Sequence, residues 1–279
     1  MTPAALWALT RNGDLLHLDP SSAEVLGSTE FSSGDSVSAV GAYAAGNLWL
    51  AVEGSGDLLH VSTSDGSILE HVPADSPCCI VSNGDQLWDA GSQQSVVNRL
   101  DPSTGQVVQR VAVDEPLGRV VIGTDAVYAL LDKADKVVRI DGNGAVVAST
   151  SVPGLDIFGA FAAGTLWVDD QEGLVVLDGT TLEVNRTIEG VYPNHLVGDG
   201  DVVWVADAAD SVTRIDATSG EVAQWAQITD PAQIEVAGDT LYVLDRDGRI
   251  WLGSTTNPGV RALAGTPKGI SQLVYTAAS

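Results

Sequence analysis

The chain has 279 residues, with 37 Asp and Glu against 13 Lys and Arg, which gives a formal net charge of −24. A surface this acidic repels phosphate backbones and anionic lipid headgroups, so the composition argues against nucleic acid and membranes as partners. No apolar run approaches the roughly 20 residues that a membrane helix needs. The 44% hydrophobic content is typical of a globular protein and too high for a disordered one.

An aromatic residue inside a short apolar run recurs along the whole chain. The first run is Ala5-Leu6-Trp7-Ala8, and neighbouring runs are 37 to 42 residues apart. The aromatic residues are Trp7, Trp49, Trp88, Tyr128, Trp167, Trp204 and Tyr242. A period of about 40 residues with one short aromatic strand per unit is typical of the blades of a β-propeller.

The remainder of each unit follows a common order. About a dozen residues after the aromatic comes a second strand that ends in a turn, as at Asp101–Gly105 and Asp216–Gly220, with weaker copies at Asp19, Asp141 and Asp178. Aspartate opens such a turn by accepting hydrogen bonds from the backbone, and glycine takes the left-handed position. A third strand follows, then a loop that often contains proline, then an apolar strand. Four strands per unit predict one blade.

Seven such units predict an all-β fold, a seven-bladed β-propeller with four-stranded blades, as a single domain over residues 1–279. The chain begins at a second strand of a unit and ends at a first strand, near Ile270–Tyr275. We therefore expect the C-terminal strand to complete the N-terminal blade and close the ring without an open edge. A linear solenoid would need capping repeats, and the sequence shows none.

The order Asp-x-x-Ser/Thr-Gly, apolar strand, proline, apolar strand and Leu-Trp-Val resembles that of the YVTN/YncE-like and virginiamycin B lyase-like propellers, with NHL repeats as more distant relatives. The resemblance covers the whole chain. It implies the architecture but no single activity, because these families include binding proteins, sensors and a few enzymes. Such propellers are often exported, which favours an extracytoplasmic or secreted protein whose leader has been removed over a cytoplasmic one.

The candidate ligand site is the mouth of the central channel, where the innermost strands begin and the loops differ from blade to blade. Several of these strands open with a Pro-x-x-apolar pattern, as at Pro77 and Pro193. Polar or aromatic side chains at the strand entries are the predicted ligand-binding residues: Cys78, Cys79, Phe158, Asn194, Gln233 and Lys268. The alternative is that these groups only form hydrogen bonds with neighbouring blades and water.

The same entries offer one set of candidate catalytic residues. His195 is the only histidine at a channel entry and would be the acid/base, while Arg119 (or Lys268) would stabilise developing negative charge and Asp156 would orient a partner or metal. The lyase family places catalytic histidines directly after the blade proline. Here Asn194 follows Pro193, so the resemblance transfers no catalytic residue.

Cofactor motifs are sparse. Cys78 and Cys79 are the only cysteines and are adjacent, so they form either a vicinal disulfide or two reduced thiols, and they are too few for a structural zinc site. Asp245-x-Asp247-Gly248 is a fragment of a calcium loop that lacks its downstream glutamate. Nucleotide motifs are absent. Asp216–Trp225 resembles a quinone-docking motif once, but the other blades lack its tryptophan, so we expect neither a quinone nor a nucleotide cofactor. We predict no metal site among named residues and leave a divalent metal open as a cofactor.

These observations favour a monomeric binding or sensory propeller that recognises a small molecule or peptide at the channel mouth. The alternative is a lyase, isomerase or hydrolase with its active site at the same mouth. A protein-interaction scaffold is a second alternative.

Overall fold

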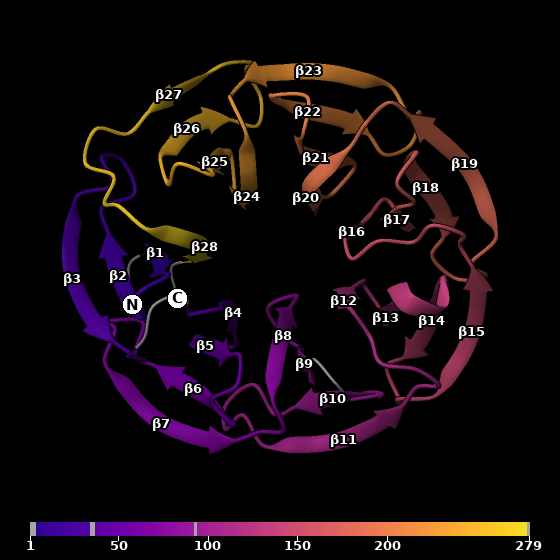
Figure 1. The fold of residues 1–279 in the computed structure, drawn as a ribbon, viewed down its shortest axis with the longest axis horizontal. Helices are drawn as coiled ribbons and strands as arrows, with labels where there is room; N and C mark the ends of the chain where they lie inside the picture. The colour runs from indigo at the N-terminus through magenta and orange to yellow at the C-terminus, as the bar shows by residue number, and fades with distance from the viewer. Residues whose placement is uncertain (1–3, 34–36, 92–93, 278–279) are drawn as a thin grey trace. The chain divides into compact units, whose positions relative to one another are not determined.

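The computed structural model describes residues 4–33, 37–91 and 94–277. Over this part of the chain the protein is an all-β seven-bladed β-propeller whose blades are four-stranded sheets (Figure 1), which confirms the predicted fold class. A short 3-10 helix, η1 (Asp132–Ala134), interrupts the strands in the fourth blade. The described residues include no helix long and apolar enough to cross a membrane.

The strands of the first three blades are given in the order in which they lie in each sheet. Blade 1 is β28 (Ile270–Thr276), β1 (Ala5–Thr10), β2 (Asp14–Leu18) and β3 (Val25–Glu30); blade 2 is β4 (Ala39–Ala44), β5 (Asn47–Val52), β6 (Asp57–Val61) and β7 (Ile68–Pro73); blade 3 is β8 (Pro77–Ser82), β9 (Leu87–Gly91), β10 (Val96–Leu100) and β11 (Val107–Ala112).

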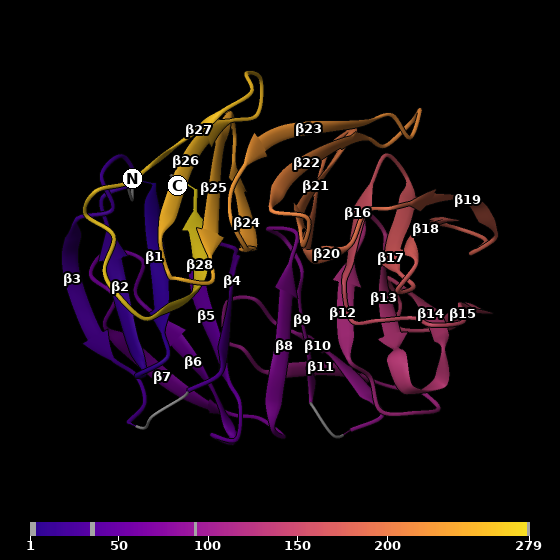
Figure 2. The same cartoon turned by 45° about the horizontal axis from the view of Figure 1, so that its top comes forward.

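The other four blades follow the chain in the same way, and Figure 2 lets each sheet be followed from its first to its fourth strand. Blade 4 is β12 (Arg119–Ile122), β13 (Ala126–Leu131), β14 (Lys136–Asp141) and β15 (Val146–Ser151); blade 5 is β16 (Gly159–Ala162), β17 (Thr165–Asp169), β18 (Gly173–Asp178) and β19 (Val184–Glu189); blade 6 is β20 (Pro193–Asp199), β21 (Val202–Asp207), β22 (Ser211–Asp216) and β23 (Val222–Gln227); blade 7 is β24 (Pro231–Ala237), β25 (Thr240–Asp245), β26 (Ile250–Ser254) and β27 (Val260–Ala262).

Blade 1 is assembled from both ends of the chain. The C-terminal strand β28 pairs antiparallel with β1, with Val274 opposite Trp7 and Tyr275 opposite Leu6. The indole Nε1 of Trp7 also donates a hydrogen bond to Thr276 Oγ1 at 3.2 Å. The C-terminal strand therefore completes the N-terminal blade, and the predicted closure is confirmed.

Contacts along the chain divide it into two units. The first unit contains Met1–Asp89, Leu100–Val108 and Glu235–Ser279, and the second contains Ala90–Arg99 and Gln109–Ile234. Blades 1 and 2 belong to the first unit, and blades 4, 5 and 6 belong to the second. The assignment of one domain to residues 1–279 stays a prediction.

The hydrophobic cores lie between neighbouring blades of the same unit. One cluster joins Tyr128 and Leu130 of blade 4 to Leu166 and Val168 of blade 5, and another joins Trp7 of blade 1 to strands of blade 2. The second strands are buried along their length because both of their faces meet another sheet. The fourth strands alternate between exposed and half-buried residues because only one face is covered. This explains why the second strands read as continuous apolar runs.

In blades 2, 4 and 7 the aromatic residue of the second strand forms a hydrogen bond with the turn of the next blade. In the first unit Trp49 Nε1 donates to the carbonyl of Pro102 at 3.0 Å, and the Tyr242 hydroxyl donates to the carbonyl of Pro20 at 3.1 Å. In the second unit the Tyr128 hydroxyl donates to the carbonyl of Gly179 at 2.5 Å. Each acceptor directly follows the aspartate that opens its turn. The other tryptophans of the second strands differ: Trp7, Trp88 and Trp167 donate to Thr276, Gln86 and Thr165, and the buried Nε1 of Trp204 has no hydrogen-bond partner in the described part of the chain.

The aspartate turns have the predicted hydrogen bonds. Asp101 Oδ1 accepts the N–H groups of Ser103 at 2.8 Å and Thr104 at 3.1 Å, and Gly105 follows with a φ of +65°. Glycine is not required in every blade, because Ala23 and Leu182 hold the equivalent position with a φ of +60°. Both side chains are buried in the cores, and this burial offsets the roughly 1–2 kcal/mol that a left-handed conformation costs an L-residue.

One glycine allows the first strands of blades 5 and 6 to approach closely. A Cβ atom on Gly198 of β20 would lie 1.9 Å from the carbonyl oxygen of Phe161 on β16. No side chain fits in that space unless the backbone moves. Gly198 therefore sets how closely these two blades pack.

We expect Tyr242→Phe and Tyr128→Phe each to lower the free energy of unfolding by about 1 kcal/mol, because each removes one hydrogen bond between blades and leaves the ring in place. Urea unfolding would show a lower midpoint with an unchanged slope. Tyr192→Phe is the control, since the Tyr192 side chain is exposed in the loop before β20. Equal losses in all three variants would contradict the role given to the contacts between blades.

Candidate functional site

Two charged or titratable side chains hold the same register position on first strands of the second unit. Arg119 on β12 lies opposite Leu130, and His195 on β20 lies opposite Ala206. In each blade the opposite residue is the second one after the aromatic of the second strand. The strand between them, β16, packs against both β12 and β20.

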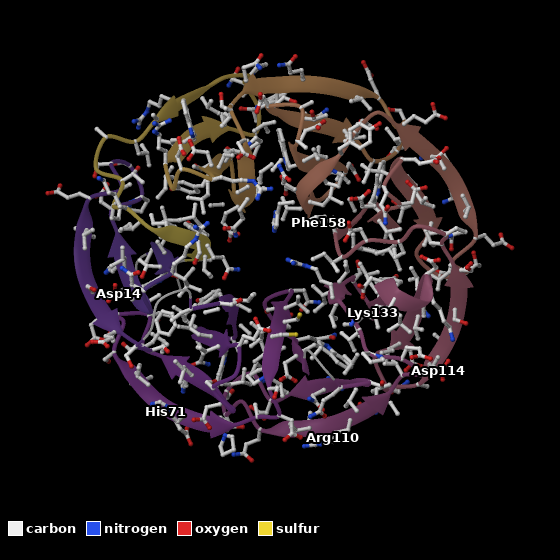
Figure 3. The ribbon with its side chains drawn as sticks, in the orientation of Figure 1. Asp14, His71, Arg110, Asp114, Lys133 and Phe158 are labelled. Carbon is white, nitrogen blue, oxygen red and sulfur yellow. The ribbon has the colours of Figure 1, made fainter. Side chains whose placement is uncertain are left out.

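Phe158 holds the corresponding position in blade 5. Its carbonyl accepts the N–H of Asp169, the second residue after Trp167, at 3.1 Å. Figure 3 labels Phe158 beside the first strand of its sheet, whereas Arg110 is labelled on β11, the fourth strand of blade 3. The Phe158 side chain packs against the core that joins blades 5 and 6. The structure thus gives one aromatic and two basic side chains at equivalent positions of three consecutive blades.

His195 is held neutral by its surroundings. Its Nδ1 accepts the N–H of Ile234 on β24 at 3.5 Å. The side chain keeps part of its surface accessible, but protein atoms enclose it, and this desolvation together with the positive charge of Arg119 lowers the pKa of His195 to about 3. A neutral imidazole whose Nδ1 accepts a hydrogen bond carries its proton on Nε2. His195 is therefore a hydrogen-bond donor at neutral pH.

The residues beside His195 connect it to the next first strand. The pairing of β20 shifts register between Pro193 and His195, so Asn194 is the extra residue of a bulge. The Asn194 amide donates to the carbonyl of Pro231 at 2.9 Å. Gln233, two residues further along β24, is buried. Asn194 thus forms a hydrogen bond with the neighbouring blade, which was the alternative to ligand binding. A ligand-binding role for Asn194 stays a prediction.

Asp156 lies in the loop before β16. Its Oδ1 accepts the N–H of Ile157 at 2.7 Å, and its own N–H donates to the carbonyl of Asp169 at 2.9 Å. Burial, together with the negative charges of Asp156 and Asp170, raises the pKa of Asp169 to about 6. The structure brings Asp156 beside Asp169, and its proposed partnership with His195 stays a prediction.

The other predicted ligand-binding residues belong to the first unit. Cys78 and Cys79 are half-buried on β8, and their sulfurs are 2.8 Å apart. Lys268 is exposed in the turn before β28. Gly269, which fits the Pro-x-x pattern, lies in the same turn with a φ of +80°.

Two polar first-strand residues of the first unit, Gln272 and Glu235, do not stand out in the sequence. Gln272, opposite Leu9, holds the register position of Arg119 and His195, and its Oε1 accepts the N–H of Gly41 at 3.0 Å. Glu235 accepts the N–H of Tyr275 at 3.0 Å, and burial raises its pKa to about 7. The third position of the Pro-x-x pattern, counted from Pro267, is Gly269 and not Gln272. Gln272 is found instead as the residue opposite Leu9, which is the second residue after Trp7.

The aspartates of the loops serve the backbone. Asp245 accepts the N–H of Arg249 and the indole N–H of Trp251, both at 2.9 Å, and Asp207 accepts the N–H of Ala209 at 3.0 Å. Within the described ranges, no group of three or more His, Cys, Asp or Glu side chains could hold a metal ion. Hydrogen bonding within turns therefore explains the concentration of acidic residues in these loops.

The fold and its first-strand positions define a seven-bladed β-propeller, and solved structures of that class are similar to the chain. A functionally unknown protein from Desulfotomaculum acetoxidans has a TM-score of 0.74 at 11% identity, covering 99% of this chain and 100% of that one. Virginiamycin B lyase from Staphylococcus aureus has a TM-score of 0.65 at 14% identity, covering 90% and 94%. AztD from Citrobacter koseri has a TM-score of 0.63 at 14% identity, covering 99% of each. No protein-family model and no curated protein matches the chain. The resemblance inferred from the repeats is thus confirmed for the fold.

We expect the imidazole of His195 to stay neutral, with its proton on Nε2, from pH 8 down to pH 5, because its pKa is about 3. Nitrogen NMR of protein labelled in histidine measures the charge and tautomer of each ring, and a His195→Gln variant assigns the signal. A His195 signal that titrates near 6.5, the ordinary histidine pKa, would contradict this arrangement.

The raised pKa of Glu235 leads us to expect that the stability of the protein depends on pH. Its folded pKa of about 7 lies above the ordinary 4.5, so the unfolded chain ionises first as the pH rises through 4.5, and stability is lost up to about pH 7. Relative to Glu235→Gln, the wild type should lose about 2 kcal/mol of unfolding free energy between pH 4.5 and 8, after allowance for screening of this partly exposed group. Urea unfolding at several pH values measures the difference. Glu183→Gln, in an exposed turn, should follow the wild type.

Proposed function

We propose that the protein is a binding or sensory propeller that recognises a small molecule or peptide through the first strands of blades 4 and 6. The proposal rests on one observation: Arg119 on β12 and a neutral His195 on β20 occupy equivalent register positions of their blades. Arg119 is close enough for its charge to act on His195. Both side chains offer N–H donors and neither offers a negative charge.

The N–H donors of Arg119 and His195 suit a ligand that presents a carboxylate or carbonyl oxygen. Guanidinium groups bind carboxylates through two parallel hydrogen bonds, and a neutral imidazole adds a donor without the cost of ionising. The bulge at Asn194 and the hydrogen bond from Ile234 hold the imidazole in place before a ligand arrives. A donor set held in advance by the backbone reduces the ordering cost of binding.

The same features speak against proton transfer by His195. A general acid or base works best with a pKa near the operating pH, whereas the pKa of His195 is about 3. The imidazolium form is then a negligible fraction at neutral pH, and the neutral form is a weak base. Binding therefore fits the site better than a lyase, isomerase or hydrolase reaction.

Thermal shifts with small mono- and dicarboxylates, amino acids and short acidic peptides test the proposal. A probe that stabilises the wild type should bind Arg119→Gln about tenfold or more weakly, because a charge-assisted hydrogen bond is lost. His195→Gln should also weaken binding. Arg110→Gln, the same change at an exposed site on β11, should bind normally.

Three results would contradict the proposal. The first is the absence of a shift with every probe, which would exclude this ligand class. The second is binding that is indifferent to both Arg119→Gln and His195→Gln. The third is conversion of a bound probe, followed by NMR, that depends on His195, which would favour the enzyme.

A further inference from the structure

The two cysteines of the chain are arranged unusually for neighbours in a strand. Successive side chains of a regular β-strand point to opposite faces of the sheet. Cys78 and Cys79 are consecutive residues of β8, yet their sulfurs are 2.8 Å apart. The backbone at this point therefore departs from the regular pleat, so that both thiols reach the same place.

The corresponding strand of blade 6 shows the same kind of departure. Pro77-Cys78-Cys79-Ile80 begins β8 as Pro193-Asn194-His195-Leu196 begins β20. In β20 the register shifts between Pro193 and His195, which leaves Asn194 as the extra residue. A bulge of this kind brings two consecutive side chains to one side of a strand. Cys78 occupies the place of that extra residue.

The surroundings of the pair favour the protonated form of the Cys78 thiol. The hydrogen bond to Cys79 and burial raise the pKa of the Cys78 thiol, and the negative charges of Cys79, Glu53 and Asp89 raise it further. The two sulfurs share one hydrogen bond at 2.8 Å, in which either thiol can be the donor.

We propose that Cys78 and Cys79 are a reversible oxidation site at which a peroxide converts the two thiols into a disulfide between adjacent residues. Both side chains are half-buried, so a small oxidant can reach them. The site lies in the first unit, and the proposal does not depend on ligand binding by Arg119 and His195.

The reaction balances with hydrogen peroxide as the only co-reactant. One of the two cysteines, as its thiolate, attacks one peroxide oxygen and breaks the O–O bond, which gives a sulfenic acid and a hydroxide that takes the proton the thiol lost and becomes water. The sulfur of the other cysteine then attacks the sulfenic sulfur, forms the S–S bond and expels the hydroxyl, which leaves as a second water with the proton of that second thiol. Two thiols are oxidised by two electrons in all, and one peroxide is reduced to two waters. The sulfurs have to approach to about 2.05 Å from their present separation.

The wild-type protein permits a direct test, because Cys78 and Cys79 are its only cysteines. The reduced full-length chain is treated with hydrogen peroxide, its thiols are counted with a chromogenic disulfide, and its intact mass is measured. We expect both thiols to disappear together, the monomer to lose about 2 Da, and dithiothreitol to restore both. Thiols that survive excess peroxide, oxygen added to sulfur without a disulfide, or a disulfide-linked dimer would each overturn the proposal.

Single variants test the second step. Cys78→Ser and Cys79→Ser each remove one of the two sulfurs of the disulfide, so in each variant oxidation by peroxide should stop at a sulfenic acid that dimedone traps. The wild type should give little dimedone adduct under the same conditions, because its second sulfur forms the disulfide. A dimedone adduct on the wild type at the level of the variants would overturn the proposal. The wild-type measurement stands even if either variant folds poorly.

Discussion

A hydrogen bond from the aromatic residue of one blade to the turn of the next holds neighbouring blades in register. Trp49, Tyr128 and Tyr242 all donate to the carbonyl of the residue that follows a turn aspartate or its equivalent. The aromatic ring fills the core between two sheets while its polar atom satisfies a backbone carbonyl. The turn must therefore present that carbonyl in one geometry, which the aspartate fixes through its own hydrogen bonds. Core packing and turn chemistry thus depend on each other in every blade that has this contact.

That dependence explains why the fold could be predicted from the sequence. Evenly spaced aromatics and aspartate turns are local patterns, and together they specify the blades and the closure by β28. The features of the fold that the sequence patterns do not predict depend on tertiary packing. Ala23 and Leu182 take left-handed conformations that a turn rule reserves for glycine, because burial of their side chains compensates. The indole N–H of Trp204 has no partner in the described part of the chain, although its strand has the same apolar pattern as those of Trp49, Tyr128 and Tyr242.

The candidate site was predictable only in part. The proline pattern identified the strand entries and hence His195 and Asn194. Bulges change the number of residues between the proline and the register position of interest, so the pattern does not identify Gln272 on β28. The sequence identifies a residue as histidine or glutamate but does not give the pKa of its side chain in the fold. The low pKa of His195 and the high pKa of Glu235 both come from desolvation in the fold. The separation of the two sulfurs depends on a local break in the pleat, which no spacing rule encodes.

The pairing of β28 with β1 has a consequence for biosynthesis. Strand β1 is buried along its whole length, and one of its edges is covered by β28, which comes last among the described strands. Until β28 emerges from the ribosome, β1 carries an unsatisfied row of backbone groups flanked by apolar side chains, which is a template for pairing with other chains. This vulnerable interval lasts as long as the ribosome takes to make the segment from β1 to β28. Molecular chaperones that shield exposed strand edges should matter most in that interval.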